Sequence, residues 1–456
     1  PVLVNNTTCY DKTTKVLTEN GIKSFNEIKV GDKVWTLNKD NLELNGVEKK
    51  YEYEYDSKMV RFKNKQFDLL VTPNHRMYYK KIHSDKWEVK EASEFLSNKT
   101  TLRKFPMKGI WEGKGKISFD KISLNTNSIR FKRDFKALVQ LIGWYISEGC
   151  LDKDNINKYN QIRISNTQKP YQKEIVNIFT RLGVKASVRD NTFQGVVATN
   201  IELANFLKQF GTSKYTKKIG KMILSLPKDY LKELFVTLMK GDGSKHKTTK
   251  NWEVYITTST QLKDDVVELI LKLGYSPRIN RTKASQPVIR GRVVNDKECW
   301  RISVRYVAKG LMSGKQVSEE NYTGKVWCIE TKNNNLFVER NGKVVCSGNS
   351  MPELVIPGVT GEICKTDRHR FTPDNSWVWT ADVNDLYKCM ERLYKRLHEP
   401  NTIAEDCRKH IVENYNIDTL TKTAWIPLME NLQEELLPPT LTKPVEEDKI
   451  ELPATV

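Results

Sequence analysis

Alternation of apolar and polar residues dominates the first part of the chain. Short alternating runs such as KVWTL, MVRFK and FDLLV lie between residues 9 and about 125, with turn signals at ENG and TPN. A period of two is typical of half-buried β-strands. Residues 322–349 repeat this pattern, with Asn341–Gly342 as a hairpin signal. We therefore predict two strand-rich segments with a different region between them.

The region between them contains an internal repeat. The first copy reads LVQLIGWYISEGCLD and then QIRISNTQKPYQKEIVNIFTRLGVKASV; the second reads ELFVTLMKGDGSKH and then EVYITTSTQLKDDVVELILKLGYSPRI. Each copy predicts an apolar helix ending in an acid and Gly, a strand, an amphipathic helix ending in Leu-Gly, and another strand. The offset is 94 residues from Glu148 to Asp242 and 91 from Gly183 to Gly274. Equal units predict a pseudo-twofold domain at about residues 128–318.

The pattern changes again between Asn349 and Ser350. From there the sequence is of α/β type, with a strand-like ELVI, a GVTGE turn, and helices around ADVNDLYKCMERLYKRL and NTIAEDCRKHIVENY. Residues 437–456 are rich in Pro and acids, so we expect a disordered tail. Because the chain begins at Pro1 without an initiator Met, we also expect a piece of a longer protein.

The net charge changes at the same boundary. Residues 350–456 hold 12 Lys and Arg against 19 Asp and Glu, a net of −7, whereas residues 1–349 carry +26. A basic excess favours a nucleic-acid partner, although a Lys-rich surface from an AT-biased genome would also produce it. The eight cysteines form no CxxC pair, which argues against zinc ribbons and a disulfide scaffold and for a reducing cytoplasm. No apolar run is long enough to predict a membrane span.

The acids of the repeat suggest a metal site. If the two apolar helices pack side by side, Glu148 and Asp242 meet at one end of the pair. Two carboxylates there can bind divalent cations, which activate water and stabilise a phosphoryl leaving group. The flanking strands would form a basic saddle for duplex DNA. One such motif would be an ordinary helix with a glycine cap, but two copies with matching downstream elements favour the site.

The stretches LIGWYISEG and FVTLMKGDG resemble the paired motifs of LAGLIDADG homing endonucleases over about 190 residues. The resemblance implies a monomeric enzyme that cuts double-stranded DNA with Mg²⁺ held by Glu148 and Asp242. Val236 and Thr237 stand where small packing residues are usual, so we expect a looser approach of the helices. An assisting basic residue is also implied, but the spacing assigns no lysine. A nuclease that has decayed to DNA binding remains an alternative.

The strand-rich segments carry a second set of motifs. CYDKTTKVLTENGIKSFNEIKVGDKVWT begins at Cys9, LLVTPNHRMYY carries Thr72 and His75, and VVCSGNS ends in Asn349 and Ser350. In order and spacing these resemble the splicing blocks of inteins, which have the Hint fold. Each residue alone has an ordinary explanation as a buried thiol, a loop histidine or a turn residue. Together they favour splicing, because the nucleophiles stand at the two ends of one domain.

The resemblance implies an autocatalytic reaction. The Cys9 thiol attacks the carbonyl carbon of Thr8 and turns the amide into a thioester. His75, oriented with help from the Thr of the same block, protonates the amide nitrogen. The Ser350 hydroxyl then takes the acyl group, the side chain of Asn349 cyclises and cleaves its own peptide bond, and an O-to-N shift leaves a normal peptide.

Three positions depart from the family pattern. Gly348 stands where a histidine usually assists cyclisation, and Asn335 stands near the place of an upstream histidine. Cys328 replaces a common Asp, and we assign it to linking the steps of the reaction. We expect Cys346 to be structural. It remains open which group assists cyclisation of Asn349.

Joining residue 8 to residue 350 gives PVLVNNTT-SMPELVIPGVTGE. This sequence resembles the nucleotide-sugar-binding half of GT-B glycosyltransferases over about 115 residues. The resemblance implies a Rossmann-like fold, a nucleotide-sugar donor for the complete host, and Glu353 near the donor site, with the turn facing a diphosphate. The acceptor half is missing, so we expect no sugar transfer by this chain alone.

We therefore predict a multidomain protein with an all-β Hint domain, an α+β pseudo-twofold endonuclease domain and an α/β host fragment. Two alternatives remain: a splicing-only, DNA-binding intein with an inactive nuclease, and a function that lies in the host glycosyltransferase alone. The predicted boundaries are 1–8 (host), 9–127 (Hint), 128–318 (endonuclease), 319–349 (Hint), 350–436 (host) and 437–456 (tail).

Overall fold

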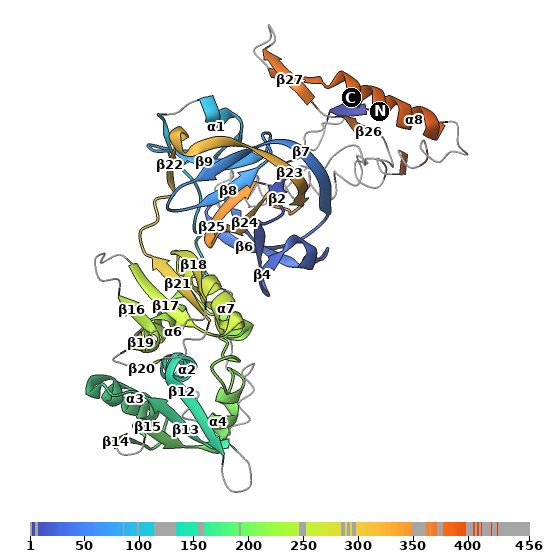
Figure 1. The fold of residues 1–456 in the computed structure, drawn as a ribbon. Helices are drawn as coiled ribbons and strands as arrows, with labels where there is room; N and C mark the ends of the chain where they lie inside the picture. The colour runs from blue at the N-terminus through green and yellow to red at the C-terminus, as the bar shows by residue number, and fades with distance from the viewer. Residues whose placement is uncertain are drawn as a thin grey trace, which may run out of the picture. The chain divides into compact units, whose positions relative to one another are not determined.

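The chain forms two compact units, one of residues 1–6 and 352–456 and one of residues 7–351 (Figure 1). The computed structural model describes residues 2–4, 8–84, 86–97, 100–113, 134–153, 159–190, 193–245, 252–283, 288–289, 292–293, 298–348, 362–364, 366–371, 377–397 and single positions between 405 and 426. No helix in these ranges is long and apolar enough to cross a membrane.

The strand-rich segments form the predicted β-structure. From the N-terminal side come β2 (Tyr10–Asp11), β3 (Lys15–Thr18), β4 (Gly21–Ser24), β5 (Lys33–Asn38), β6 (Asn41–Gly46), β7 (Lys50–Lys63), β8 (Asp68–Val71), β9 (Arg76–Lys81), β10 (Glu88–Glu91) and β11 (Leu102–Lys104), with the short helices η1 (Phe25–Glu27) and α1 (Glu94–Ser97). From the C-terminal side come β22 (Leu311–Ser313), η3 (Gly314–Gln316), β23 (Val317–Ile329), β24 (Asn335–Arg340) and β25 (Lys343–Gly348). Strands β2, β23, β7 and β8 close a barrel, so segments some 300 residues apart in sequence lie side by side (Figure 1).

The predicted hairpin at Asn341–Gly342 is confirmed and joins β24 to β25. The two residues have φ of 51° and 75°. Positive φ at both central residues is the requirement of the tight turn that suits twisted antiparallel strands, and Asn-Gly meets it at low cost.

The predicted repeat is also confirmed. The first copy has α2 (Phe135–Glu148), β12 (Gly149–Lys153), β13 (Tyr159–Ser165), α3 (Lys169–Arg181), β14 (Ala186–Asp190), β15 (Gln194–Thr199) and α4 (Ile201–Lys208). After α5 (Lys221–Leu224), the second copy has α6 (Lys228–Gly241), β16 (Gly243–Lys245), β17 (Trp252–Thr257), α7 (Thr260–Lys272), β18 (Ser276–Thr282) and β21 (Cys299–Arg305), with β19 (Val288–Ile289) and β20 (Arg292–Val293) as a small hairpin. Each copy thus contributes four neighbouring strands, in the order β12-β13-β15-β14 in the first copy and β16-β17-β21-β18 in the second.

Helices α2 and α6 pack closely, and our expectation of a looser approach was wrong. Val236 points away from the contact and is 41% exposed. Thr237 is buried against Gly143, where an added Cβ would overlap the Thr237 hydroxyl. That hydroxyl is satisfied within its own helix by the carbonyl oxygen of Leu234, at 2.9 Å. A glycine on the facing helix therefore compensates for the larger residue.

The repeat and the splicing strands share one sheet and one core. The sheet runs β16-β17-β21-β18-β25-β24-β3-β5-β6, and β18 meets β25 at the pair Arg278–Lys343. At this junction Ile279 N–H donates to Gly342 O at 2.7 Å. Buried residues of both regions, among them Trp35 and Leu271, belong to the same hydrophobic cluster. The two predicted domains therefore form a single compact unit.

In the other unit, strands from the two ends of the chain pair with each other. β1 (Val2–Val4) is parallel to β26 (Glu362–Cys364), and the predicted helix α8 (Val383–Leu397) packs against both. β27 (Thr366–Phe371) and β28 (Trp377–Ala381) form a hairpin. The predicted ELVI strand, GVTGE turn, second helix and tail lie outside the described residues, apart from single positions.

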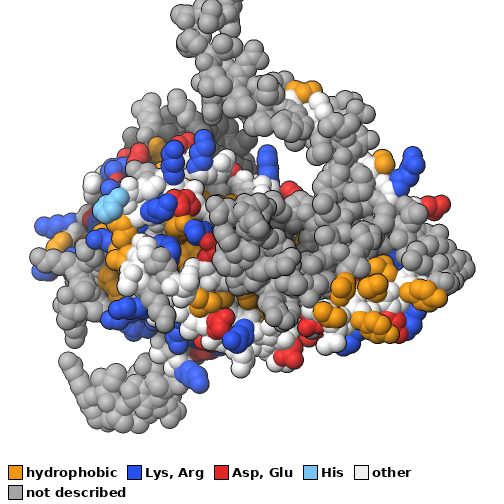
Figure 2. All heavy atoms as spheres, turned by 90° about the horizontal axis from the view of Figure 1, so that it is seen from above, with side chains coloured by type: hydrophobic (Ala, Val, Ile, Leu, Met, Phe, Trp, Pro, Cys, Tyr) orange, Lys and Arg blue, Asp and Glu red, His pale blue; other side chains and the backbone are white. Residues whose placement is uncertain are grey.

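One face of α8 is apolar and exposed. Val383, Tyr387, Met390 and Tyr394 follow a helical spacing and are 58–77% exposed, and hydrophobic side chains gather over this helix in Figure 2. A surface helix normally buries such a stripe against a core.

Candidate functional site

The predicted splicing residues of the N-terminal side lie together inside the barrel. Cys9 is fully buried, and its backbone N–H, the amide of the Thr8–Cys9 bond, donates to Thr72 Oγ1 at 2.9 Å. In return Thr72 N–H donates to Cys9 O at 3.0 Å, and His75 N–H donates to Thr72 O at 2.9 Å. These bonds fix Thr72 against the bond that the sequence predicts to break.

His75 connects this bond to the C-terminal strand. Its ring is fully buried, and Nε2 lies 2.9 Å from Ser347 Oγ on β25. Burial lowers the pKa of His75 to about 3, although the Thr8 backbone opposes this shift. The Tyr10 ring packs on the imidazole with centroids 4.5 Å apart. The imidazole is therefore neutral at neutral pH and can donate from one ring nitrogen while accepting at the other.

Cys328 lies beside Cys9. It is 1% exposed and shares a small apolar cluster with Cys9, Met59 and Leu70. The antiparallel pairs Tyr10–Trp327 and Asp11–Val326 place the two cysteines opposite each other if the register continues by one residue. Opposed residues of such strands have Cα atoms about 4.5–5.5 Å apart.

Asn349 and Ser350 lie outside the described residues, but the preceding Gly348 is described and buried. Tyr10 Oη donates to Gly348 O at 2.7 Å. A Cβ at position 348 would clash with the backbone oxygen of Arg76 and lie 2.8 Å from its Cβ. Backbone therefore fills the space that the side chain of a penultimate histidine would need to enter.

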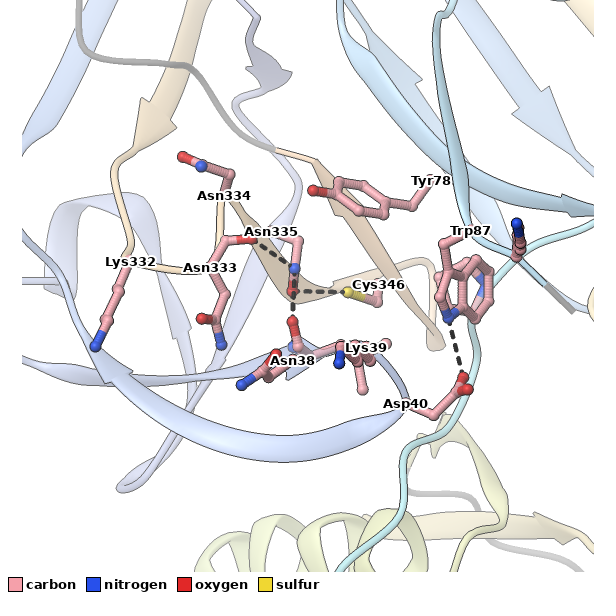
Figure 3. Close-up of a pocket in the computed structure, with 13 residues that line it drawn as sticks. Asn38, Lys39, Asp40, Tyr78, Trp87, Lys332, Asn333, Asn334, Asn335 and Cys346 are labelled. Carbon is pink, nitrogen blue, oxygen red and sulfur yellow. Dashed lines mark hydrogen bonds between the residues drawn. The ribbon is translucent and has the colours of Figure 1, made fainter. Parts of the chain in front are cut away.

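Asn335, the residue near the place of the other missing histidine, has a structural role. Its Oδ1 accepts from Leu37 N–H at 2.7 Å and from the Cys346 thiol at 3.3 Å. Its Nδ2 donates to Leu37 O and Asn333 O, both at 2.8 Å. Figure 3 shows this amide at the wall of a cavity of about 680 Å³, with Tyr78 across from it. Burial raises the pKa of the Cys346 thiol well above its ordinary value, which agrees with an inert, structural cysteine.

A buried ionic network, which the sequence did not reveal, ties the N-terminal strands to the hairpin. Arg340 pairs with Asp11 and with Asp68, each at 2.9 Å, and Arg61 pairs with Asp68 at 2.8 Å. Burial by itself raises the pKa of Asp68, but the Asn341 hydrogen bond and the two guanidinium charges hold it below its ordinary value. The network joins segments about 330 residues apart.

The two acids of the repeat come together at the ends of their helices. Glu148 ends α2 and Asp242 follows α6, and an added Cβ at Gly241 would lie 3.2 Å from Glu148 Cγ. Burial raises the pKa of Glu148. Burial, followed by the charge of Glu148, raises the pKa of Asp242 to about 7, while Tyr255 and Lys217 oppose the shift. Each carboxylate therefore disfavours ionisation of the other.

Lys217 is a functional candidate that the sequence reasoning missed. It comes from the segment between the two copies, and its Nζ donates to Tyr145 O at 2.6 Å and to Gly149 O at 2.9 Å. Burial lowers its pKa to about 7, with Cys150 and Asp242 opposing. The only sequence signal is the lysine-rich run KYTKK at residues 214–218, where spacing cannot single out one lysine.

The acid pair fits a divalent cation. Within the described residues there is no group of three or more His, Cys, Asp and Glu side chains that could form a complete protein ligand set. A pair of carboxylates, completed by water and substrate oxygens, is instead the arrangement that Mg²⁺ commonly uses. The mutual repulsion of Glu148 and Asp242 is the property that such a cation would relieve.

Comparisons with known proteins found one family model that is similar to part of the chain. Residues 136–211 match the LAGLIDADG-like domain. Two curated relatives are the "DNA-directed RNA polymerase subunit beta C-terminal section" of Stigeoclonium helveticum, 25% identical over 74% of this chain and 36% of its own length, and the "ATP-dependent Clp protease proteolytic subunit" of Chlamydomonas moewusii, 23% identical over 75% and 36%. The chain thus spans about a third of the length of these relatives.

Two solved structures are similar to parts of the chain. One is the AceL NrdHF class 3 split intein in a splice-inactive variant, with 9% identity, a TM-score of 0.25, and coverage of 75% of this chain and 99% of that chain. The other is a mesophilic variant of the homing endonuclease I-DmoI, with 13% identity, a TM-score of 0.29, and coverage of 38% and 89%. The segment that matches the LAGLIDADG-like domain, residues 136–211, holds α2 and Glu148.

Proposed function

We propose that residues 9–349 are a self-splicing intein with an embedded DNA endonuclease, and that residues 1–8 and 350–456 belong to the interrupted host. The observation that carries the proposal is the arrangement around the Thr8–Cys9 bond. Thr72 bonds to its amide, His75 packs beside it, and Cys328 lies in the same cluster as Cys9.

Three further observations support an insertion. The chain divides into compact units after residues 6 and 351, each within two residues of a predicted junction. The host strands β1 and β26, from opposite sides of the insertion, pair in parallel. The two relatives carry unrelated enzyme names, yet each aligns with about three quarters of this chain. An element that enters different host proteins would produce that combination.

The geometry supports a specific course for splicing. Cys9 Sγ attacks the Thr8 carbonyl carbon, the C–N bond breaks, and the released nitrogen takes a proton through the neutral His75. The hydrogen bond to Thr72 orients the amide while this occurs. Cys328 links the steps by taking the acyl group from Cys9 in a thioester exchange, which conserves the acyl bond and one thiol proton. Ser350 then receives the acyl group.

Cyclisation of Asn349 breaks the peptide bond to Ser350 and releases the intein. Because no side chain at position 348 can help, we assign assistance to the Ser347–His75 pair, which is joined at 2.9 Å. Tyr10, which donates to the carbonyl oxygen of Gly348, holds the end of β25 in place. The final O-to-N shift joins Thr8 to Ser350.

Expression of the chain tests splicing. We expect a ligated product of 115 residues, 1–8 joined to 350–456, and an excised product of 341 residues. Cys9→Ala combined with Asn349→Ala should leave the 456-residue precursor intact. A wild-type chain that never splices, or ligation in the double variant, would contradict the proposal.

We infer that the embedded domain cuts double-stranded DNA as a monomer, since both acids come from one chain. Glu148 and Asp242 would hold Mg²⁺, which supplies Lewis-acid stabilisation of the phosphate and lowers the pKa of a bound water. Lys217 fixes the carbonyl end of α2 and so orients Glu148. Incubating the protein with Mg²⁺ and the uninterrupted host gene tests this; DNA binding without any cleavage would favour the inactive-nuclease alternative.

For the host we propose an α/β glycosyltransferase of GT-B type, on the basis of its sequence motif. The parallel pair β1–β26 with α8 against it is an α/β element, and the exposed stripe of α8 leaves room for further host structure. The complete, spliced host should bind a nucleotide sugar, which calorimetry would measure. No binding of any nucleotide sugar would remove this proposal without affecting splicing.

A further inference from the structure

Positive side chains gather where the repeat joins the splicing strands. Arg278 of β18, Arg305 of β21 and Lys343 of β25 lie together. They are next to Lys63, the last residue of β7, and Lys65, in the loop between β7 and β8. We call these five side chains the junction cluster. Among the described residues, none of the five has a carboxylate within 4.0 Å. The nearby Asp68 instead forms salt bridges with Arg61 and Arg340.

The cluster is under mutual repulsion. Burial lowers the pKa of Lys343, and the charges of Arg278, Lys63 and Arg305 add to this, although Asp68 opposes it. Burial and the charge of Arg278 likewise lower the pKa of Arg305 to about 10. The Nε atoms of Arg278 and Arg305 are buried without a hydrogen-bond partner in the described part of the chain. Arg305 stacks on the ring of Trp252, 4.6 Å from its centroid, but this contact does not neutralise its charge. A group of positive charges without carboxylate partners attracts a polyanion.

The two buried cations also hold the loop rigidly. Lys343 Nζ donates to Asn64 O at 2.7 Å, and Arg305 Nη2 donates to Lys65 O at 2.9 Å. The Asn64 side chain donates to Leu311 O at 3.0 Å. The end of β7 and the loop therefore present the exposed Lys63 and Lys65 at fixed positions, which reduces the conformational entropy that binding would cost.

The cluster lies on the sheet face that is turned away from α7. Ile279, Ile302 and Val304 point into the core, where α7 packs. Arg278 and Arg305 alternate with these residues and so point to the opposite face. The equivalent face of the first copy carries Arg163, which differs because Asp152 neutralises it. The second copy thus has an unneutralised face at the edge where the splicing strands begin.

We propose that the junction cluster binds phosphates of the DNA backbone, so that the splicing region contributes directly to DNA binding. The proposal rests on the proposed endonuclease function and extends its binding surface beyond the repeat to the exposed Lys63 and Lys65, which the buried Arg305 and Lys343 hold in place. Lysines act as point charges on phosphates and read no base sequence. An acidic polypeptide is the competing polyanion; DNA is favoured because the cluster continues the strand face of the acid-bearing repeat.

The test compares two double variants of the full chain. Lys63→Ala with Lys65→Ala removes the two exposed cluster charges. Lys58→Ala with Lys325→Ala removes the same charge from β7 and β23, where each lysine already pairs with a glutamate. Binding to the uninterrupted host-gene duplex is measured by fluorescence anisotropy without divalent cations over a range of salt, and splicing yield and circular dichroism report folding.

We expect the cluster variant to lose about 10-fold or more in affinity at low salt, with the slope of log K against log salt reduced by about 1.8. The control variant should bind like the wild type. Equal binding by all three proteins, or equal loss in both variants, would overturn the proposal while leaving the endonuclease intact. No DNA binding by the wild type would instead refute the endonuclease function. Polyglutamate is tested in the same assay as the competing polyanion. If the Lys63→Ala, Lys65→Ala variant loses affinity for polyglutamate but keeps its affinity for DNA, the partner is an acidic polypeptide and the proposal is overturned.

Discussion

The two candidate reaction centres of residues 7–351 use burial in opposite ways. Around the Thr8–Cys9 bond, burial keeps His75 neutral, with a pKa of about 3. Around the acid pair, burial raises the pKa of Asp242 to about 7 and lowers that of Lys217 to about 7. The first centre holds its reacting bond inside the fold and needs no entry path. The second raises the pKa of both carboxylates, that of Asp242 to about 7, so that an incoming cation favours their charged forms.

The largest expected effect separates the two centres. Asp242→Asn should reduce DNA cleavage by about 10³-fold or more, because one carboxylate cannot replace the charge of two toward a divalent cation. Splicing should proceed at the wild-type rate in the same preparation. Gel assays of both reactions measure this. Unchanged cleavage would contradict the role of Asp242 in metal binding. Loss of splicing together with cleavage would contradict the independence of the two centres.

The complementary change addresses the splicing centre. Gly348→Ala should destabilise the protein by about 1–3 kcal/mol, because its Cβ meets the Arg76 backbone. It should also slow C-terminal cleavage, while DNA cleavage stays normal at temperatures where the protein is folded. Gly46→Ala, where an added Cβ meets nothing within 4 Å, is the matched control. Gly348→His should be worse than Gly348→Ala; faster splicing with histidine would refute the steric explanation.

A smaller effect is expected at Lys217. Lys217→Met should lower the DNA cleavage rate about 10²-fold, since the carbonyl end of α2 loses its two donors. The neighbouring Lys218→Met is the control. If Lys217 orients Glu148, a higher Mg²⁺ concentration should partly rescue the variant; a change in stability alone, with normal cleavage at low temperature, would contradict this role.

The smallest effect is a pH dependence of stability. His75 has a folded-state pKa of about 3, below the value of about 6.5 for an exposed histidine. Between these two values the unfolded chain binds more protons, so stability rises with pH through this window and is lost as pH falls. Denaturant unfolding of a non-splicing precursor at pH 5 and pH 7 should show this, and His75→Gln should flatten the difference. An unchanged slope would mean that the imidazole is solvated.

The local elements could be predicted because their signals are short in sequence. Period-two runs indicated the strands, the apolar spacing indicated the paired helices, and Asn341–Gly342 met the backbone demand of a tight hairpin. The predicted residues Cys9, Thr72 and His75 do lie together, and so do Glu148 and Asp242. The roles of residues 349 and 350 stay a prediction, since both lie outside the described residues.

The sequence by itself determined the order of the elements, the repeat and the change of charge after Asn349, because composition and periodicity are properties of neighbouring residues. Only the tertiary structure decided that Ser347 meets His75, that Lys217 reaches α2, and that Arg76 excludes a side chain at Gly348. These contacts join residues from 72 to 272 positions apart. Their formation depends on how the two strand-rich segments and the two helices close on each other, and no local pattern encodes that packing.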